Sequence, residues 1–334
     1  MTTSQTETLD HGPAGGDLPE GKDASRTGRI GDRVFRLASS GSGVLLLAIM
    51  AAIAVFLVIQ ALPALRANTA PFLTEKIWNP NAVPPRFGIA ALAFGTVVSS
   101  LIALVIATPV AVAVALFISH YAPRRLAATL GYVVDLLAAV PSVVYGLWGA
   151  VFLVPLIMDP ASWLNRNLAF LPIFNGQPVS SGKSIFTASV VLAIMILPII
   201  AAISREVFLQ VPKANEEAAL ALGATRWEMV RMAVLPFGRP GVISASMLGL
   251  GRALGETIAV ALIVSASFEI DWNVMMPGGN SIAANIANTF QEAGATGRGA
   301  LIASGLVLFV ITLVVNMAAR AVIARRKEYA RAGA

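Results

Sequence analysis

Two opposite charges stand inside an otherwise apolar stretch of this 334-residue chain. Arg252 and Glu256 lie in the segment that follows Pro240 and runs to about Ala266. At about 1.5 Å per helical residue, they lie roughly 18 Å and roughly 24 Å along it, inside a lipid core about 30 Å thick. Each charge costs on the order of 3 kcal/mol to insert there, so such residues usually face a partner helix or a water-filled path. In such a path, the two-pronged guanidinium of an arginine is suited to binding an oxyanion.

A purely structural explanation of this pair is an i,i+4 salt bridge that steadies one helix. Arginine precedes glutamate here, which is the weaker order for helix support, so we favour the functional explanation and keep this one as the alternative. Three glycines accompany the pair. Gly251 and Gly255 form G-x-x-x-G around Arg252, with Gly249 close before them. This spacing would let a neighbouring helix approach closely, although the pattern is a weak signal by itself.

A charged elbow, residues 205–239, precedes the apolar segment. Gly223 stands where a left-handed residue ends a first short helix. Thr225 and Glu228 then form T-x-x-E, a capping box that starts a second helix. That second helix is predicted to end near Pro236, because proline disfavours helical geometry in the residue before it.

The elbow also carries the spaced motif E-A-A-x3-G followed by L-P, formed by Glu217, Ala218, Ala219, Gly223, Leu235 and Pro236. This spacing resembles the EAA loop of ABC importer permeases, which docks into a groove of a cytoplasmic ATPase. Ala233 departs from that pattern, since the family commonly has isoleucine there. The alternative is a capped helical hairpin that has no such partner.

The composition places most of the chain in lipid. Hydrophobic residues make up 57% and charged residues 13%, with a mean hydropathy of +0.76, so we predict an integral membrane protein. Cysteine is absent, which excludes disulfides and thiolate metal sites, and the two histidines form no zinc motif. The formal charge of +6 comes from basic residues spread over short loops, which membrane topology explains better than nucleic-acid binding.

Apolar segments predict an all-α protein with six transmembrane helices. Residues 1–35 are predicted to be a disordered tail, residues 36–325 the membrane domain, and residues 326–334 a basic tail. The six spans are predicted at about 44–62, 91–118, 131–156, 186–203, 241–266 and 300–323.

Lysine and arginine gather before the first span, in the elbow and in the C-terminal tail. Both termini and the elbow are therefore predicted to be cytoplasmic. Asp135, near the cytoplasmic end of the third span, is expected to be water-exposed or paired with an arginine. Residues 176–184 loosely resemble a phosphate loop, but their glycines are one residue too far apart and the segment faces outward, so we predict no nucleotide site.

Further runs carry a more specific resemblance. They are Gly251–Thr257 (GRALGET), Ala138–Gly149 (AAVPSVVYGLWG), Pro84–Ile89 (PPRFGI) and Gly95–Thr96. Together they resemble PstC-type permease subunits of phosphate-specific ABC importers, from about Phe35 to the C-terminus. The resemblance implies a type I ABC importer permease, with the MetI-like fold, in a bacterial cytoplasmic membrane.

The same resemblance implies a subunit without catalytic residues that forms half of a translocation path, with Arg252 and Glu256 in that path. It implies four kinds of partner: a homologous PstA-like permease, a PstB-like ATPase dimer, an extracytoplasmic PstS-like phosphate-binding protein and phosphate itself. ATP and Mg would be bound by the ATPase, and no cofactor or metal by this chain.

Two other functions remain open. A sulfate or molybdate permease shares R-A-L-G-E, although the run from Pro141 through Tyr145 to Trp148 argues against it. A proton-coupled secondary transporter could use Glu256 and Arg252 directly, but the elbow would then have no partner.

Overall fold

The computed structural model describes residues 24–176, 181–276 and 278–332. The chain divides into two units at Val55 and Phe56, within the long helix α1 (Ala24–Ala67). This helix begins well before the first predicted span, so residues 24–35 are helical rather than disordered. Extending an existing helix costs much less than starting one, which explains how these polar residues join it. The rest of the predicted tail, residues 1–23, lies outside the described residues.

The second unit is a helical body built around α2 (Ala90–Leu116), α7 (Ile185–Leu209) and α10 (Leu235–Leu254). Helix α2 lies along α7, and α10 contacts both of them. The core between them combines small residues of α2, such as Ala107, with large ones of α7, such as Ile196. This pairing of small with large side chains allows the helices to pack closely in an apolar environment.

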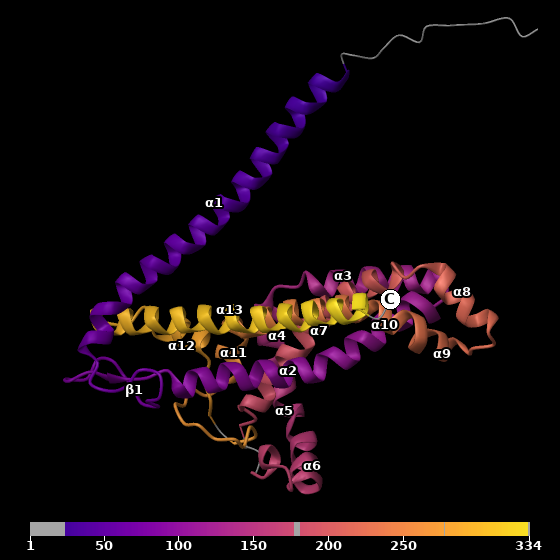
Figure 1. Ribbon diagram of the computed structural model, residues 1–334. Coiled ribbons are helices and arrows are strands. Elements are labelled where there is room, and N and C mark those ends of the chain that lie inside the picture. Colours follow the sequence, from indigo (N-terminus) through magenta and orange to yellow (C-terminus); the bar gives the residue numbers. More distant parts are fainter. Residues whose placement is uncertain (1–23, 177–180, 277, 333–334) are drawn as a thin grey trace, which may run out of the picture. The chain divides into compact units, whose positions relative to one another are not determined.

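Five helices in the described residues are long and apolar enough to cross a membrane, and a bent pair brings the number to as many as six. This result agrees with the predicted all-α class and the six spans. The last span lies in α13 (Ala295–Ala332), which packs on α10 (Figure 1). Residues 326–332 of the predicted basic tail continue that helix.

The third predicted span is the bent pair, and the prediction of one helix over 131–156 is wrong. Helix α3 (Arg124–Ala138) ends before Pro141, and α4 (Ser142–Trp148) then leaves at 90°. Proline lacks an N–H and disfavours helical geometry in the residue before it, so the chain turns here. The path then continues through η2 (Gly149–Leu153), α5 (Val154–Leu156), α6 (Met158–Leu168) and η3 (Pro172–Phe174).

The fifth predicted span is also broken. Helix α10 ends at Leu254 and α11 (Ile258–Ile263) begins three residues later, so the prediction of one helix over 241–266 is wrong. Gly255 is a poor helix former, and the Glu256 side chain bonds to a backbone amide at the start of α11, which competes with helix continuation.

At its other end, α10 continues the elbow without interruption. Helix α9 (Arg226–Met229) passes into a π-helical turn, η4 (Val230–Val234), and then into α10. The prediction that the second elbow helix ends near Pro236 is therefore wrong. Pro236 directly follows the π-helical turn, whose i→i+5 bonding locally interrupts the α-helical ladder, so a residue without an N–H is tolerated there.

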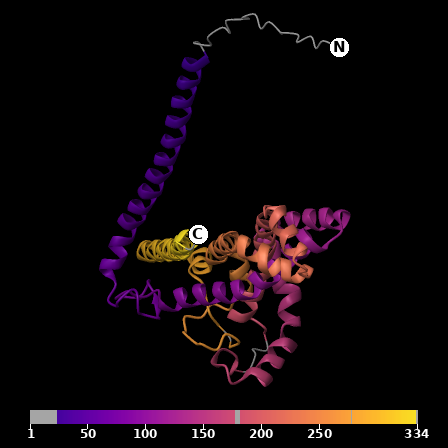
Figure 2. The same cartoon turned by 45° about the vertical axis from the view of Figure 1, so that its right-hand side comes forward.

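The helical body has two distinct ends (Figure 1, Figure 2). One, the hairpin end, carries the antiparallel strands β1 (Trp78–Asn79) and β2 (Arg86–Phe87), in which Trp78 pairs with Phe87. The other, the elbow end, carries α8 (Lys213–Ala221) and α9. Two further elements are η1 (Phe117–Tyr121), which extends α2, and α12 (Ile282–Thr289), which packs on α13, α11 and α2.

Candidate functional site

Arg252 and Glu256 lie on opposite sides of the break between α10 and α11. Arg252 is half-buried in the last turn of α10, whereas Glu256 follows that helix and is only 7% exposed. Within the described part of the chain, the two side chains form no ion pair with one another. The i,i+4 salt bridge considered as the alternative does not form, because the helix ends between its two members.

Arg252 reaches the end of α3. Its Nη1 donates a hydrogen bond of 3.5 Å to the carbonyl oxygen of Ala138, the last residue of that helix. The Tyr145 hydroxyl of α4 donates one of 2.9 Å to the neighbouring carbonyl of Leu137. Free carbonyls at a helix C-terminus attract cations and hydrogen-bond donors. The two broken helices therefore meet at one place, which we call the break site (Leu137, Ala138, Tyr145, Arg252 and Glu256).

Glu256 holds the start of α11. Its Oε1 accepts a hydrogen bond of 3.1 Å from the backbone N–H of Ala259. A carboxylate near a helix N-terminus satisfies a free amide and interacts favourably with the helix dipole. The same turn of α11 packs on α4, where a Cβ added to Gly146 would lie 2.6 Å from the Cα of Ala259. The close approach of α4 and α11 therefore requires a glycine at position 146.

The three glycines near Arg252 have different surroundings. At Gly249 a Cβ would come 2.8 Å from Ile200 Cδ1, so this glycine permits close packing of α10 on α7. At Gly251 a Cβ would meet no atom within 4 Å, and at Gly255 it would meet only carbonyl oxygens of Gly251 and Arg252. Among the described residues, the close helix approach predicted for the G-x-x-x-G pair is thus not made, because Gly251 faces open space.

Among the described residues, Arg252 has guanidinium donors that make no hydrogen bond. A guanidinium has five N–H donors, and only one of those of Arg252 donates a hydrogen bond to another described residue. The remaining donors are half-buried at a place where the backbone of two helices is interrupted. In membrane proteins, irregular backbone is tolerated where it is buried in protein or lines a cavity. Guanidinium donors of this kind are groups that bind oxyanions.

The elbow has both local features that its sequence predicts. Gly223 adopts the left-handed conformation, with φ of +84°. Glu228 N donates to Thr225 Oγ1 at 3.3 Å, and Thr225 N donates to Glu228 Oε2 at 2.8 Å, which completes the capping box. Within the spaced motif, Ala219 and Leu235 pack against one buried apolar cluster, while Glu217, Ala218 and Pro236 remain exposed.

The elbow exposes large apolar side chains beside these polar groups. Leu222 is 90% exposed and Trp227 57% exposed. Met232 and Phe237 follow on the same continuous stretch of helix and are exposed too. Apolar side chains that gather among charged residues of a loop typically mark a surface that another protein covers.

Asp135 is paired with an arginine, one of the two environments that its position predicts. Its Oδ2 lies 3.2 Å from Nη2 of Arg205, and the same Arg205 nitrogen lies 2.8 Å from Glu206 Oε1.

Two other contacts in the structure are not indicated by any pattern in the sequence. Tyr145 meets the end of α3 only because the chain turns at Pro141. His120 meets Glu216 of α8 across 96 positions of the sequence.

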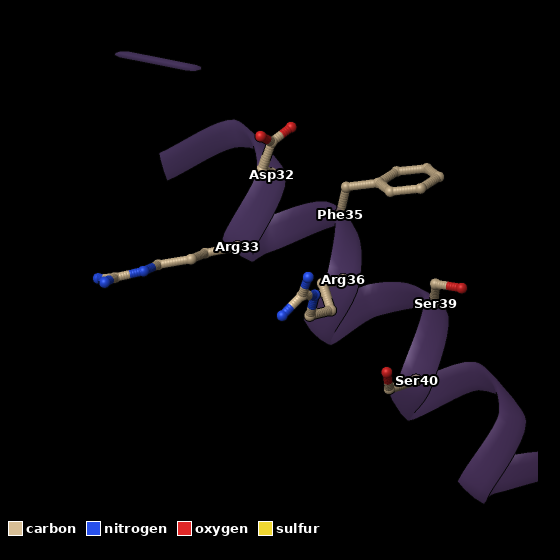
Figure 3. A pocket seen from close by; sticks show the side chains of 6 residues that line it. All are labelled: Asp32, Arg33, Phe35, Arg36, Ser39 and Ser40. Carbon is tan, nitrogen blue, oxygen red and sulfur yellow. The ribbon is translucent and has the colours of Figure 1, made fainter. Parts of the chain in front are cut away.

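A space of about 690 Å³ also lies along α1, lined by Asp32, Arg33, Phe35, Arg36, Ser39 and Ser40 (Figure 3). All six residues are exposed and belong to one stretch of a single helix. A binding site usually requires groups that converge from several sides, so we assign this space no function.

Comparison with known proteins places the chain among transport proteins. Residues 107–328 match the family described as "Binding-protein-dependent transport system inner membrane component". The protein named "Phosphate transport system permease protein PstC 2" of Mycobacterium tuberculosis is 50% identical over 302 residues, which cover 89% of this chain and 93% of that protein. The "Phosphate transport system permease protein PstC" of Xylella fastidiosa is 40% identical over 95% of this chain and 96% of that protein.

Two solved structures share the fold. A chain of a bacterial ABC transporter involved in the import of alginate matches with a TM-score of 0.55 at 17% identity, over 89% of this chain and 99% of that one. A chain of the MetNI methionine ABC transporter in an inward-facing conformation matches with a TM-score of 0.51 at 16% identity, over 69% of this chain and 92% of that one. These matches agree with the predicted MetI-like permease fold.

Proposed function

Because the chain belongs to the family of binding-protein-dependent transport system inner membrane components, we propose that it is the PstC-type permease subunit of an ATP-driven phosphate importer. The observation that carries the proposal is the identity of 37–50% to several proteins named as phosphate transport permeases, each over most of the chain. The half-buried guanidinium of Arg252 at the break site supports the same substrate class, because phosphate is an oxyanion that two parallel N–H groups can bind.

The chain supplies half of a translocation path, and a homologous PstA-like permease supplies the other half. Gly251 is the point at which this face of α10 is open, because a Cβ there would meet no atom of the described residues within 4 Å. Small residues at such a face allow a second permease to approach closely. In this arrangement Arg252 and Glu256 lie beside the path between the two permeases.

A PstB-like ATPase dimer docks on the elbow and carries ATP and Mg. The exposed Leu222 and Trp227 give that docking surface its apolar part. From Trp227 to Arg252 the chain is one helix of α9, η4 and α10, roughly 40 Å long. A tilt of the elbow when the ATPase closes is therefore passed directly to the residue that meets phosphate.

The extracytoplasmic PstS-like binding protein delivers phosphate at the hairpin end. This assignment follows from the predicted topology, in which the elbow is cytoplasmic, since the hairpin and the elbow lie at opposite ends of the helical body (Figure 1). Glu256 stays bonded to the start of α11 and balances the nearby positive charge when the path is empty.

Uptake of radiolabelled phosphate tests this function. Cells that lack their own phosphate importer would express the chain together with a PstA-like permease, a PstB-like ATPase and a PstS-like binding protein. We expect phosphate uptake that needs ATP, copurification of the ATPase with this chain, and competition by unlabelled phosphate but not by sulfate or molybdate. Uptake of sulfate or molybdate instead would move the protein to that class of permease. Uptake driven by a proton gradient without the ATPase would favour a secondary transporter.

A further inference from the structure

We propose that His120 is a positioning residue that couples the elbow to α2 through Glu216, an inference that rests on the proposed ATP-driven transport. His120 lies in the π-helical turn η1, which extends the elbow end of α2. Its Nε2 lies 3.3 Å from Oε1 of Glu216 in α8. The His120 side chain is 8% exposed and that of Glu216 is 24% exposed, so this polar contact is largely shielded from water.

The orientation of the His120 ring is fixed from its other side. Ser119 Oγ lies 2.7 Å from His120 Nδ1 and 2.8 Å from the carbonyl oxygen of Ala115 in α2. When Nε2 carries the proton that bonds Glu216, the single hydroxyl hydrogen of Ser119 donates to Nδ1, which fixes the orientation of the imidazole. A π-helical turn contains one more residue than an α-helical turn, and such turns are frequent at functional sites. Here the turn directs Nε2 toward α8.

Apolar contacts surround this polar one. Ala115 and Leu116 of α2 belong to the same buried cluster as Val230 and Val234 of η4, and Ala219 of α8 packs against that cluster. Apolar packing is non-directional and lets one element shift against another, whereas a hydrogen bond fixes distance and register. The contact of His120 with Glu216 therefore makes α2 follow α8 when α8 moves.

This contact gives the elbow a second connection to the path. The first is the continuous helix from α9 to α10. The second runs from Glu216 to His120 and along α2 to Thr108, whose Oγ1 donates to Ser246 Oγ of α10 at 3.5 Å. Ser246 lies less than two helical turns before Arg252. Both connections thus end on the part of α10 that carries the guanidinium.

The test uses the complete complex in proteoliposomes, and it measures phosphate imported per ATP hydrolysed. We expect His120→Ala to lower this ratio about fivefold, the size of effect that one hydrogen bond has on an equilibrium, while the amount of copurified ATPase stays unchanged. His120→Gln can still donate to Glu216 and should recover more than half of the ratio. Adding Glu216→Ala to His120→Ala should have no further effect. Thr129→Ala, at an exposed position of α3 outside the elbow, is the control.

Hydrogen exchange of the same complexes separates this inference from the proposed function, because it needs no transport. His120→Ala should raise backbone amide exchange over Lys213–Ala221 at least twofold relative to Thr129→Ala. An unchanged import ratio, unchanged exchange, or additive effects in the double variant would each overturn the inference. If the wild-type complex imports no phosphate, but His120→Ala still raises the amide exchange of α8 above that of the control variant, the proposed function is contradicted. The contact of His120 with Glu216 is then still supported.

Discussion

Among the described residues, Arg252 makes one long hydrogen bond at the break site. In the proposed path, a phosphate oxygen would replace the Ala138 carbonyl as an acceptor for the N–H groups of Arg252. Glu256 does not form an ion pair with Arg252 among the described residues, and its carboxylate bonds to the start of α11 instead. The two side chains therefore make separate contacts, Arg252 with the end of α3 and Glu256 with the start of α11.

Arg252→Gln should abolish phosphate uptake while the complex still assembles, because the amide has neither the charge nor the two-pronged donor. Arg252→Lys should recover only part of the uptake, on the order of one tenth of the wild-type rate, since an ammonium binds as a point charge. Uptake at matched expression measures this, with copurified ATPase as the assembly control. Normal uptake by a variant with apolar residues at both 252 and 256 would remove Arg252 from the path.

Two substitutions of Glu256 distinguish the role of its hydrogen bond to the start of α11 from the role of its negative charge. Glu256→Gln keeps an oxygen that can accept from Ala259 N, so we expect normal assembly and stability. Glu256→Ala should lose about 1 kcal/mol through the missing cap, seen as earlier thermal unfolding in detergent. If charge balance matters in the path, the glutamine variant imports phosphate more slowly at normal stability. Equal transport by wild type and the glutamine variant would restrict Glu256 to holding α11.

At the scale of elements, the break site depends on how closely α4 packs on α11. Gly146→Val places a side chain where even a Cβ would lie 2.6 Å from Ala259 Cα. Overpacking of this kind costs about 1–3 kcal/mol, so we expect earlier thermal unfolding and reduced uptake. Gly251→Ala is the control, because a Cβ there meets no atom of the described chain within 4 Å. Gly251→Ala should leave the thermal unfolding temperature of the isolated chain unchanged and weaken only its association with the second permease. An unfolding temperature as low as that of Gly146→Val would contradict this expectation.

The elbow depends on the left-handed residue between α8 and α9. Gly223→Val should strain that turn by about 1–2 kcal/mol, because a β-branched residue disfavours φ of +84°. A Cβ at Gly223 would meet no atom of the described residues within 4 Å, so backbone strain rather than collision is the cause. We expect less copurified ATPase at unchanged membrane abundance. Gly223→Asn tolerates this conformation better and should restore association, and equal loss in both variants would indicate a different cause.

At the scale of the whole molecule, we propose that the two ends of the helical body lie on opposite sides of the membrane. The chain has no cysteine, so single cysteines can report the side without background. Ser181→Cys should react with an impermeant thiol reagent in intact cells, whereas Thr225→Cys should react only after the membrane is opened. Both positions are exposed. The reverse pattern would invert the topology and exclude a cytoplasmic ATPase on the elbow.

The sequence by itself determines the features that depend on local patterns. Apolar runs of sufficient length predict the spans, because lipid selects composition over some twenty residues. Gly223 and the Thr225 capping box are predicted correctly, because each involves only a few neighbouring residues. The spaced motif and the run around Arg252 likewise indicate an ABC importer permease, which the family match confirms.

Only the tertiary structure decides where the helices break and what the charges contact. Pro141 permits either a kink or a full turn, and the 90° bend depends on the packing of α4 against α11. The same packing brings Tyr145 to the end of α3 and gives Arg252 a carbonyl partner. The contact of His120 with Glu216 joins residues 96 positions apart. Spacing within one helix cannot predict such pairs, because they form only when separate helices pack side by side.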